Sequence, residues 1–253
     1  MRAISSFAKA PFQWRHYRAA ANMMRTYHRP AATFLRYLIG GGHYPDRITL
    51  STPSGAVGVT LYSEHDLLTL NEIFCRRDYD APDKAELVVD FGSNIGISAL
   101  YFLTRNPRAH AYLFEPVPMN VARLRENLGG FEGRYTLFPF AVGMVEGPVP
   151  FGCEPTGRYG GIGLSRETRI AVPCRPANVV IDEILARYGH IDVLKVDIES
   201  FEDEIILALG ERARRIETIF VERRFDSNPL RETHLYKQYG AVAQFRRRDP
   251  AVR

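Results

Sequence analysis

Residues 88–96 bring one carboxylate, one amide and two glycines together in the pattern DxGxNxG. Asp90 follows an apolar run, while Gly92 and Gly96 can take positive φ angles and let the backbone approach a ligand closely. The helix expected after Gly96 has unpaired N–H groups in its first turn. A carboxylate ahead of the turn repels a pyrophosphate but attracts a cation, such as the ammonium group of a methionine moiety. Together with Asn94, this loop favours S-adenosylmethionine over NAD, whose fingerprint is GxGxxG.

A second carboxylate, Glu115, follows the apolar run 111–114 and lies 25 residues after Asp90. In a βαβ unit, an acid about 20 residues after the glycine turn accepts hydrogen bonds from ribose hydroxyls. An acid in the first turn of a helix, favoured by the helix dipole, would explain Glu115 equally well by itself. The two features at this spacing predict a cofactor site better than either does alone.

A third group of acids follows the mostly apolar run 193–196 and consists of Asp197, Glu199 and Glu202. Acids at a strand end beside a cleft can act as general bases or contact a ligand. Glu199 and Glu202 also suit the first turn of a helix, where acids are favoured. We expect Asp197 to be the base that deprotonates an acceptor, with Glu222, at the end of the following strand, as the second choice.

The sequence also allows other residues to act as the catalytic base or to bind a metal ion. His43, His65 and His234 are scattered along the chain, and each could serve as a base. A metal-assisted route would need acids that converge, which Asp197, Glu199 and Glu222 could supply. The three cysteines, at positions 75, 153 and 174, form no CxxC pair, so neither a disulfide framework nor a structural zinc site is expected.

Strands alternate with helices from about residue 86 onward, which predicts a doubly wound, mostly parallel sheet of the Rossmann-like α/β class. We expect a domain at 81–253 that holds this sheet, preceded by helices and a β-hairpin at 1–80. The chain after the fifth strand suggests a helix at 232–239 and one strand at 241–247, so the sheet would be incomplete or differently closed. The expected strands are 87–89, 111–114, 135–140, 193–196 and 218–221, and the expected helices are 97–103, 121–128, 181–188 and 202–209.

Residues 143–173 have no clear period and are expected to be an irregular insertion, rich in glycine. Long loops in compact domains usually bind ligands or act as lids. Tyr159 with Arg158, Arg166 and Arg169 would suit the polyol face of a sugar or an anionic acceptor.

The first 47 residues carry many arginines and only Asp46 as an acid, although the whole chain has a net charge of only +4. Helices broken near Pro11 and Pro30 are expected, followed by a hairpin at 47–62 and a helix at 65–75. Such a segment could pack on the main domain, mediate a homodimer, or make a peripheral contact with a membrane. No apolar run is long enough to cross a bilayer, and arginines interrupt any signal-peptide core, so a cytoplasmic protein is expected.

The combination of DxGxNxG, FEPxPxN (114–120) and KVDIESFE (195–202) resembles the FkbM family of methyltransferases, over residues 66–223. The resemblance implies the class I methyltransferase fold and S-adenosylmethionine as the cofactor. Members of that family methylate hydroxyl groups on sugars, glycans and polyketide natural products. One departure is Ser200, where the family usually has glycine, which puts the shape of that loop in doubt. The implied roles are the methionine moiety for Asp90, Gly92, Asn94 and Gly96, the ribose for Glu115, the adenine for Ala141 and Val142, and the methyl-transfer site for Asp197 and Glu199.

The resulting expectation is an O-methyltransferase that acts on a small-molecule or glycan acceptor. Three alternatives stay open. An RNA methyltransferase would use the basic chain ends, although nucleic acid is disfavoured as a partner. An NAD-dependent oxidoreductase would need a third glycine in the turn. A non-catalytic adaptor would keep the fold without needing acids at every cofactor position.

Overall fold

The computed structural model describes residues 14–39 and 41–248, and the chain divides into two compact units, Met1–Asp80 and Ala81–Arg253. The first unit contains helices α2 and α3 and a two-stranded antiparallel hairpin, β1–β2, with Pro53 and Ser54 in its turn. A π-helical stretch, Asn71–Arg76, extends the last helix of this unit. The predicted hairpin and the helices on either side of Pro30 are confirmed, while the expected break near Pro11 lies outside the described residues. Their bounds are α2 Trp14–Thr26, α3 Pro30–Ile39, β1 Asp46–Thr52, β2 Gly55–Leu61 and α4 Glu64–Leu70.

The second unit is built on a seven-stranded sheet in the order β12-β13-β11-β10-β3-β4-β5. The five strands from β11 to β5 run parallel, and β13 runs antiparallel to both of its neighbours. All five residues of β3 are buried, as the continuous apolar run at this position predicts for a central strand. The bounds are β3 Leu87–Phe91, β4 His110–Phe114, β5 Tyr135–Phe138, β10 Ile191–Val196, β11 Ile216–Val221, β12 His234–Tyr239 and β13 Val242–Arg247.

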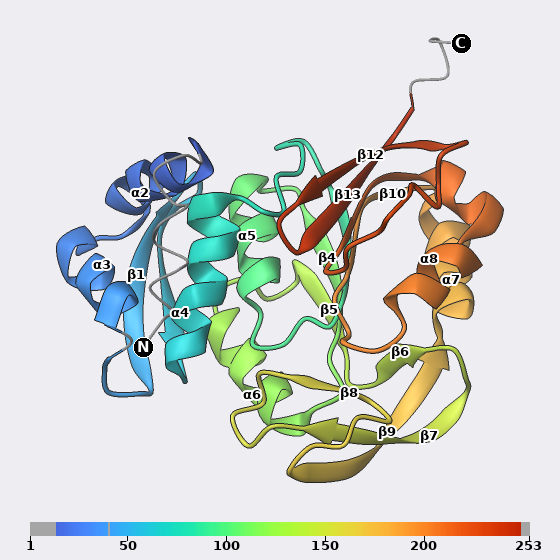
Figure 1. Cartoon of the computed structure of the whole chain (residues 1–253), viewed down its shortest axis with the longest axis horizontal. Helices are drawn as coiled ribbons and strands as arrows, with labels where there is room; N and C mark the ends of the chain where they lie inside the picture. The colour runs from blue at the N-terminus through green and yellow to red at the C-terminus, as the bar shows by residue number, and fades with distance from the viewer. Residues whose placement is uncertain (1–13, 40, 249–253) are drawn as a thin grey trace. The chain divides into compact units, whose positions relative to one another are not determined.

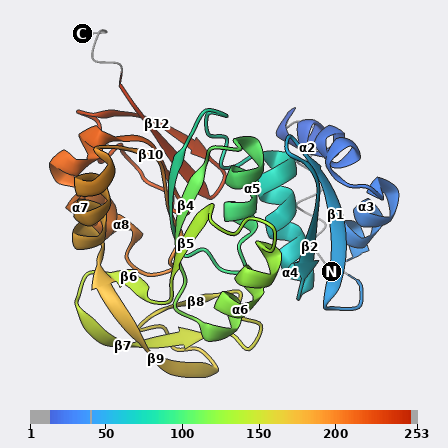
Figure 2. The ribbon, with the colours of Figure 1, turned by 180° about the vertical axis from the view of Figure 1, so that it is seen from behind.

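Helices cover both faces of this sheet (Figures 1 and 2). The helices α5, Ile97–Arg105, and α6, Pro118–Asn127, lie on one face, and α7, Ala177–Tyr188, and α8, Glu202–Ala208, lie on the other. A 3₁₀-helix, Gly210–Arg215, connects α8 to β11. The predicted doubly wound, mostly parallel α/β fold is confirmed. In such a sheet the carboxyl ends of the parallel strands lie at one edge, where ligands bind.

The part of the sheet that follows β11 in the chain differs from the prediction. Residues 234–239 form the edge strand β12, not a helix, and the sheet is a full seven strands. The side chains alternate, with His234 buried, Leu235 exposed and Tyr236 half-buried and stacked on Phe245 of β13. Pairing with β13 and burial on every second residue outweigh the helix propensity of this short segment.

The insertion after β5 is also more regular than predicted. It forms a second sheet in the order β6-β9-β7-β8, seen below the main sheet in Figure 1. Pro148 and Pro150 obscure the strand pattern of β7, but β8 pairs only with residues 151–153, so both prolines lie where β7 has a neighbour on one side only. The bounds are β6 Ala141–Gly143, β7 Gly147–Cys153, β8 Gly160–Ile162 and β9 Thr168–Pro176.

Candidate functional site

The turn between β3 and α5 requires glycine for two separate reasons. Gly92 and Gly96 have φ angles of +82° and +87°, which side chains rarely adopt. A Cβ atom on Gly92 would lie 1.8 Å from the backbone oxygen of Asp197, because the ends of β3 and β10 pass so close together. Asn94, at φ +47°, is one of the few residue types that tolerate this region. The shape of the turn therefore depends on glycine at 92 and 96 and on asparagine at 94.

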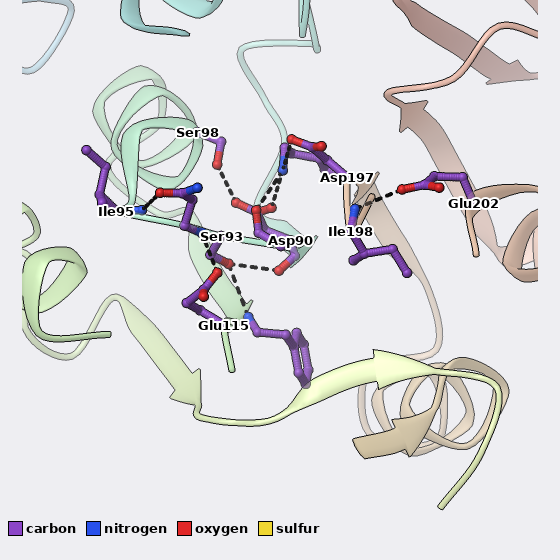
Figure 3. A network of polar contacts seen from close by, with 12 residues as sticks. Asp90, Ser93, Ile95, Ser98, Glu115, Asp197, Ile198 and Glu202 are labelled. Carbon is purple, nitrogen blue, oxygen red and sulfur yellow. Dashed lines mark hydrogen bonds and ion pairs between the residues drawn. The ribbon is translucent and has the colours of Figure 1, made fainter. Parts of the chain in front are cut away.

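Asp90 lies beneath this turn and does not line it. Its side chain is fully buried, and one carboxylate oxygen accepts a hydrogen bond from Lys195 Nζ (3.0 Å) while the other accepts one from the Ser98 hydroxyl (Figure 3). The hydroxyl of Ser93 donates to the backbone oxygen of Asp90 (2.8 Å). In this arrangement Asp90 supports the turn, and its assignment to the methionine moiety stays a prediction.

Lys195 is a residue of this site that the sequence reasoning missed. Only 2% of the residue is exposed, and its ammonium group donates to Asp90 Oδ1 (3.0 Å) and to the Gly92 oxygen (3.0 Å), with Asp197 Oδ2 at 3.2 Å. These three acceptors match the three N–H donors of an ammonium group. The signal was a single lysine inside the apolar run 193–196, because a buried lysine needs a buried partner.

The charges in this cluster do not cancel. Burial by itself would lower the pKa of Lys195, but the negative charges of Asp197 and Asp90 outweigh that effect and raise the pKa. Two carboxylates share one ammonium group, and the Asp90 side chain is fully enclosed, whereas that of Asp197 is 24% exposed. The surplus negative charge is therefore presented to solvent at Asp197, at the carboxyl end of β10.

Glu115 lies on the other side of the turn, at the end of β4, and only neutral donors hold it. It accepts hydrogen bonds from the backbone N–H groups of Asn94 (2.9 Å) and Val117 (3.0 Å) and from Asn120 Nδ2 (3.3 Å). Burial raises the pKa of Glu115 to about 7, although these donors and the charge of Lys195 act in the opposite direction. This carboxylate therefore changes its charge close to neutral pH.

The connection between β7 and β8 is tied to the same motifs. Three side chains from the turn and from α6 donate to its backbone oxygens, and Ser200 Oγ donates to Ile162 O (3.2 Å) in β8. The serine that departs from the family pattern thus attaches the loop after β10 to the second sheet. The three bonds run from Asn94 Nδ2 to Arg158 O (3.0 Å), from Asn120 Nδ2 to Gly157 O (2.8 Å) and from Arg123 Nη1 to Thr156 O (2.6 Å).

The candidate catalytic acids follow neighbouring strands. The backbone N–H of Asp197 donates to Phe91 O (3.1 Å), and that of Glu222 donates to Val196 O (3.0 Å). Both acids thus lie at the carboxyl edge of the sheet, and Glu222 is exposed. Within the loop, the backbone N–H of Ile198 donates to Glu202 Oε1 (3.0 Å), which fixes the start of α8 (Figure 3).

Glu199 occupies an unusual backbone conformation in this loop, with φ at +63°. Residues held in the left-handed region cost about 1–3 kcal/mol each and cluster at active sites. Burial raises the pKa of Glu199, as do the charges of Asp197 and Glu202, while Arg166 and Arg158 act in the opposite direction.

Ala141 and Val142 occupy β6, at the point where the chain passes from the main sheet to the second one. Both are buried, and they pair with Cys174 and Arg175 of β9. Ala141 packs in the small core of the second sheet, while Val142 belongs to the core of the main sheet. Their assignment to an adenine ring stays a prediction.

Of the candidate histidines, His43 and His65 belong to the first unit, and their role as bases stays a prediction. His234 contacts the backbone oxygen of Ile216 (3.0 Å), the first residue of β11, so it lies at the opposite edge of the sheet from Glu222. Within residues 14–39 and 41–248, no three Asp, Glu, His or Cys side chains are grouped so that they could hold a metal ion.

Comparison with known sequences finds one family whose description is the methyltransferase FkbM domain, and its model matches residues 90–245, which is more than half of the chain. Three curated relatives also match, each with less than 30% sequence identity to this chain. The 2-O-methyltransferase NoeI of Sinorhizobium fredii is 27% identical over 157 residues, covering 54% of this chain and 62% of NoeI. The hexuronic acid methyltransferase AglP of Haloferax volcanii is 24% identical over 159 residues, covering 62% of this chain and 63% of AglP.

The third relative is the AMB antimetabolite synthetase AmbE of Pseudomonas aeruginosa, which is 26% identical over 183 residues. That match covers 57% of this chain but only 8% of AmbE. The chain thus spans less than two thirds of the length of each of these three relatives.

Proposed function

This chain belongs to the FkbM methyltransferase family, and from that premise we propose that it transfers a methyl group from S-adenosylmethionine to a hydroxyl group of a sugar, glycan or related natural product. The observation that carries the proposal is the convergence of three separate motifs at one sheet edge. The glycine turn at 92–96, Glu115 and Asp197 end three adjacent strands, β3, β4 and β10. An open α/β sheet binds its ligand at this edge.

The residues at this edge fit the proposed cofactor. Glu115 ends the strand beside the glycine turn, which supports a role in holding the ribose hydroxyls, and next to it the Oδ1 atom of Asn120 is buried without a hydrogen-bond partner among the described residues. Asp197 presents the surplus negative charge of the lysine cluster, which suits the ammonium group of a methionine moiety. The cation thus falls to Asp197 in this proposal, while Asp90 has a supporting role.

When bound, S-adenosylmethionine supplies an electrophilic methyl group on a sulfonium. The chain must then hold the acceptor oxygen in line and remove its proton, a proton transfer that typically contributes about 10²- to 10⁴-fold to the rate. Glu199 suits that role best, because it is exposed after the carboxyl end of β10 and its pKa is raised, while Asp197 is engaged by Lys195. Glu222, at the end of the adjacent strand, is the second candidate.

Two observations support a sugar hydroxyl as the acceptor. The matched relatives include proteins named as a 2-O-methyltransferase and a hexuronic acid methyltransferase. In this chain the guanidinium of Arg158 lies 4.3 Å from the centre of the Tyr159 ring, in the connection that is tied to Asn94. An aromatic ring beside a guanidinium can bind the face of a sugar and a carboxylate.

The test is methyl transfer with a labelled methyl group on S-adenosylmethionine and a panel of mono- and oligosaccharides with and without uronic acids. The expected product is a methyl ether, identified by mass spectrometry and by NMR of the labelled carbon. Label on nitrogen, or on RNA offered in the same assay, would overturn the proposal. As a control for cofactor choice, S-adenosylhomocysteine at 100 times its Kd should stabilise the fold by about 2.7 kcal/mol, while NAD should not.

A further inference from the structure

Helix α3 in the first unit has its apolar side chains on the outside. Phe34, Leu35, Leu38 and Ile39 are exposed by 41%, 58%, 40% and 71%, respectively. Thr33 is the buried residue of this helix. A surface helix normally packs its apolar stripe inward and turns its polar residues to water. The arrangement in α3 is the reverse.

Polar contacts fix this orientation. Arg36, half-buried, forms an ion pair with Asp46 of β1 and donates to the backbone oxygen of Gly41 (3.1 Å). Its guanidinium lies 4.4 Å from the centre of the Tyr44 ring. Turning α3 by half a revolution would bury its apolar face but would break all of these contacts. The outward apolar face is therefore built into the unit.

The charged residues of α2 and α3 themselves are all of one sign. Residues 14–39 contain five arginines and no aspartate or glutamate. Arg18, Arg25 and Arg29 are exposed, and so are Tyr17 (55%) and Met24 (63%) of α2. The two consecutive helices (Figure 1) thus combine exposed apolar side chains with exposed arginines, and neither helix contains an acid.

We propose that the α2–α3 surface, residues 17–39, docks on the face of an anionic lipid membrane. Apolar side chains on a short basic helix insert into the boundary between headgroups and acyl chains, while arginines contact anionic headgroups. The ten residues of α3 extend for only about 15 Å, so the helix would lie in the plane of the membrane. Among the described residues, no helix is long and apolar enough to span a bilayer.

A second copy of the chain is a weaker partner for the same surface. In a symmetric dimer the same patch is present on both sides. Exposed arginines would then face arginines, with no acid between positions 14 and 39 to compensate them. An anionic bilayer provides both the apolar layer and the opposite charge.

The experiment is co-sedimentation of the full chain with vesicles of phosphatidylcholine alone and of phosphatidylcholine with 30% phosphatidylglycerol. We expect binding to the anionic vesicles, little binding to the neutral ones, and weaker binding at high salt. The double variant Leu35→Asp/Ile39→Asp should bind at least tenfold more weakly. The double variant Arg25→Glu/Arg29→Glu should also bind more weakly, because it reverses the charge.

Matched controls are Leu207→Asp and Leu235→Asp, which change leucines that are 69% and 56% exposed in the second unit. They should bind vesicles like the unchanged chain, and circular dichroism checks that every variant is folded. Failure to bind anionic vesicles, or equal losses in the controls, would overturn the proposal. So would a dimer in native mass spectrometry that the Leu35→Asp/Ile39→Asp variant abolishes without any effect on vesicle binding. None of these results depends on methyltransferase activity.

Discussion

Asp90 and Glu115 end neighbouring strands and are both buried, but the protein compensates them in different ways. Asp90 lies against the ammonium group of Lys195, so an opposite charge stabilises it. Glu115 is held by the N–H groups of Asn94, Val117 and Asn120, which carry no net charge. Burial then raises the pKa of Glu115 to about 7. One side of the turn is thus an ionic support, whereas the other is a carboxylate whose charge depends on pH.

This difference has a physical consequence for the two sides. An ion pair that is fully enclosed contributes little net stability, but removing one partner is costly because the other charge is left uncompensated. A carboxylate held by neutral donors can instead be protonated without a partner being stranded. We therefore expect substitutions on the Asp90 side to cost more of the free energy of unfolding, and those on the Glu115 side to act chiefly on ligand binding.

The largest effect is expected for Lys195→Met, which leaves Asp90 buried without a counter-charge. Breaking a buried pair in this way costs about 3–5 kcal/mol of the free energy of unfolding, measurable by urea denaturation. The double variant Lys195→Met/Asp90→Asn should recover part of the loss, because position 90 then no longer carries a buried charge without a partner. Lys84→Met, at an exposed lysine, serves as the control. Equal stability of Lys195→Met and the unchanged chain would remove the distinction between the two sides.

The second-largest effect is expected on the Glu115 side of the turn, where Glu115→Ala should weaken binding of S-adenosylhomocysteine. A hydrogen bond to a charged group contributes about 1.5–3 kcal/mol, so the Kd should rise by about 10- to 150-fold in calorimetry. Glu211→Ala changes an exposed acid in the 3₁₀-helix before β11 and should leave the Kd unchanged. An unaltered Kd in Glu115→Ala would show that the ribose assignment is wrong.

The pH dependence of stability and of cofactor binding distinguishes the Asp90 side of the turn from the Glu115 side further. The folded-state pKa of Glu115, about 7, is above its ordinary value of 4.5, so the folded state binds this proton more tightly, and the stability that Glu115 contributes is lost as the pH rises from about 4.5 to 7. Hydroxyl donors favour the ionised form, so S-adenosylhomocysteine should bind about tenfold more tightly at pH 8 than at pH 6. In Glu115→Gln both trends should disappear, as measured by calorimetry and thermal unfolding across that range. A pH dependence that persists in Glu115→Gln would belong to another group.

The smallest effect is expected at the connection between β7 and β8. Arg158→Ala and Tyr159→Ala should raise the acceptor KM by about two- to fivefold, the size of an exposed cation–π contact, and leave cofactor affinity unchanged. The matched control is Arg187→Ala, because Arg187 lies 5.2 Å from the centre of the Tyr188 ring on α7. An unchanged acceptor KM in both variants would place the acceptor elsewhere.

The elements next to the turn could be predicted from local sequence. The buried run that became β3 is apolar on both faces, and the glycines at 92 and 96 follow it directly. Each of these signals depends on neighbouring residues, which is why strand, turn and helix agree with the structure. The same reasoning failed for β12, whose six residues become a strand only through pairing with β13.

By itself, the sequence determined that Asp90, Glu115 and Asp197 end three strands of one parallel sheet, because period, length and turn residues are local properties. Only the tertiary structure decided how each of these acids is buried and which groups compensate its charge. For Asp90 the compensation comes from Lys195, which lies 105 residues away along the chain yet donates to it at 3.0 Å. The position of Asp197 depends equally on the close approach of its backbone to Gly92. Burial and charge compensation are set by such long-range packing, which no local pattern encodes.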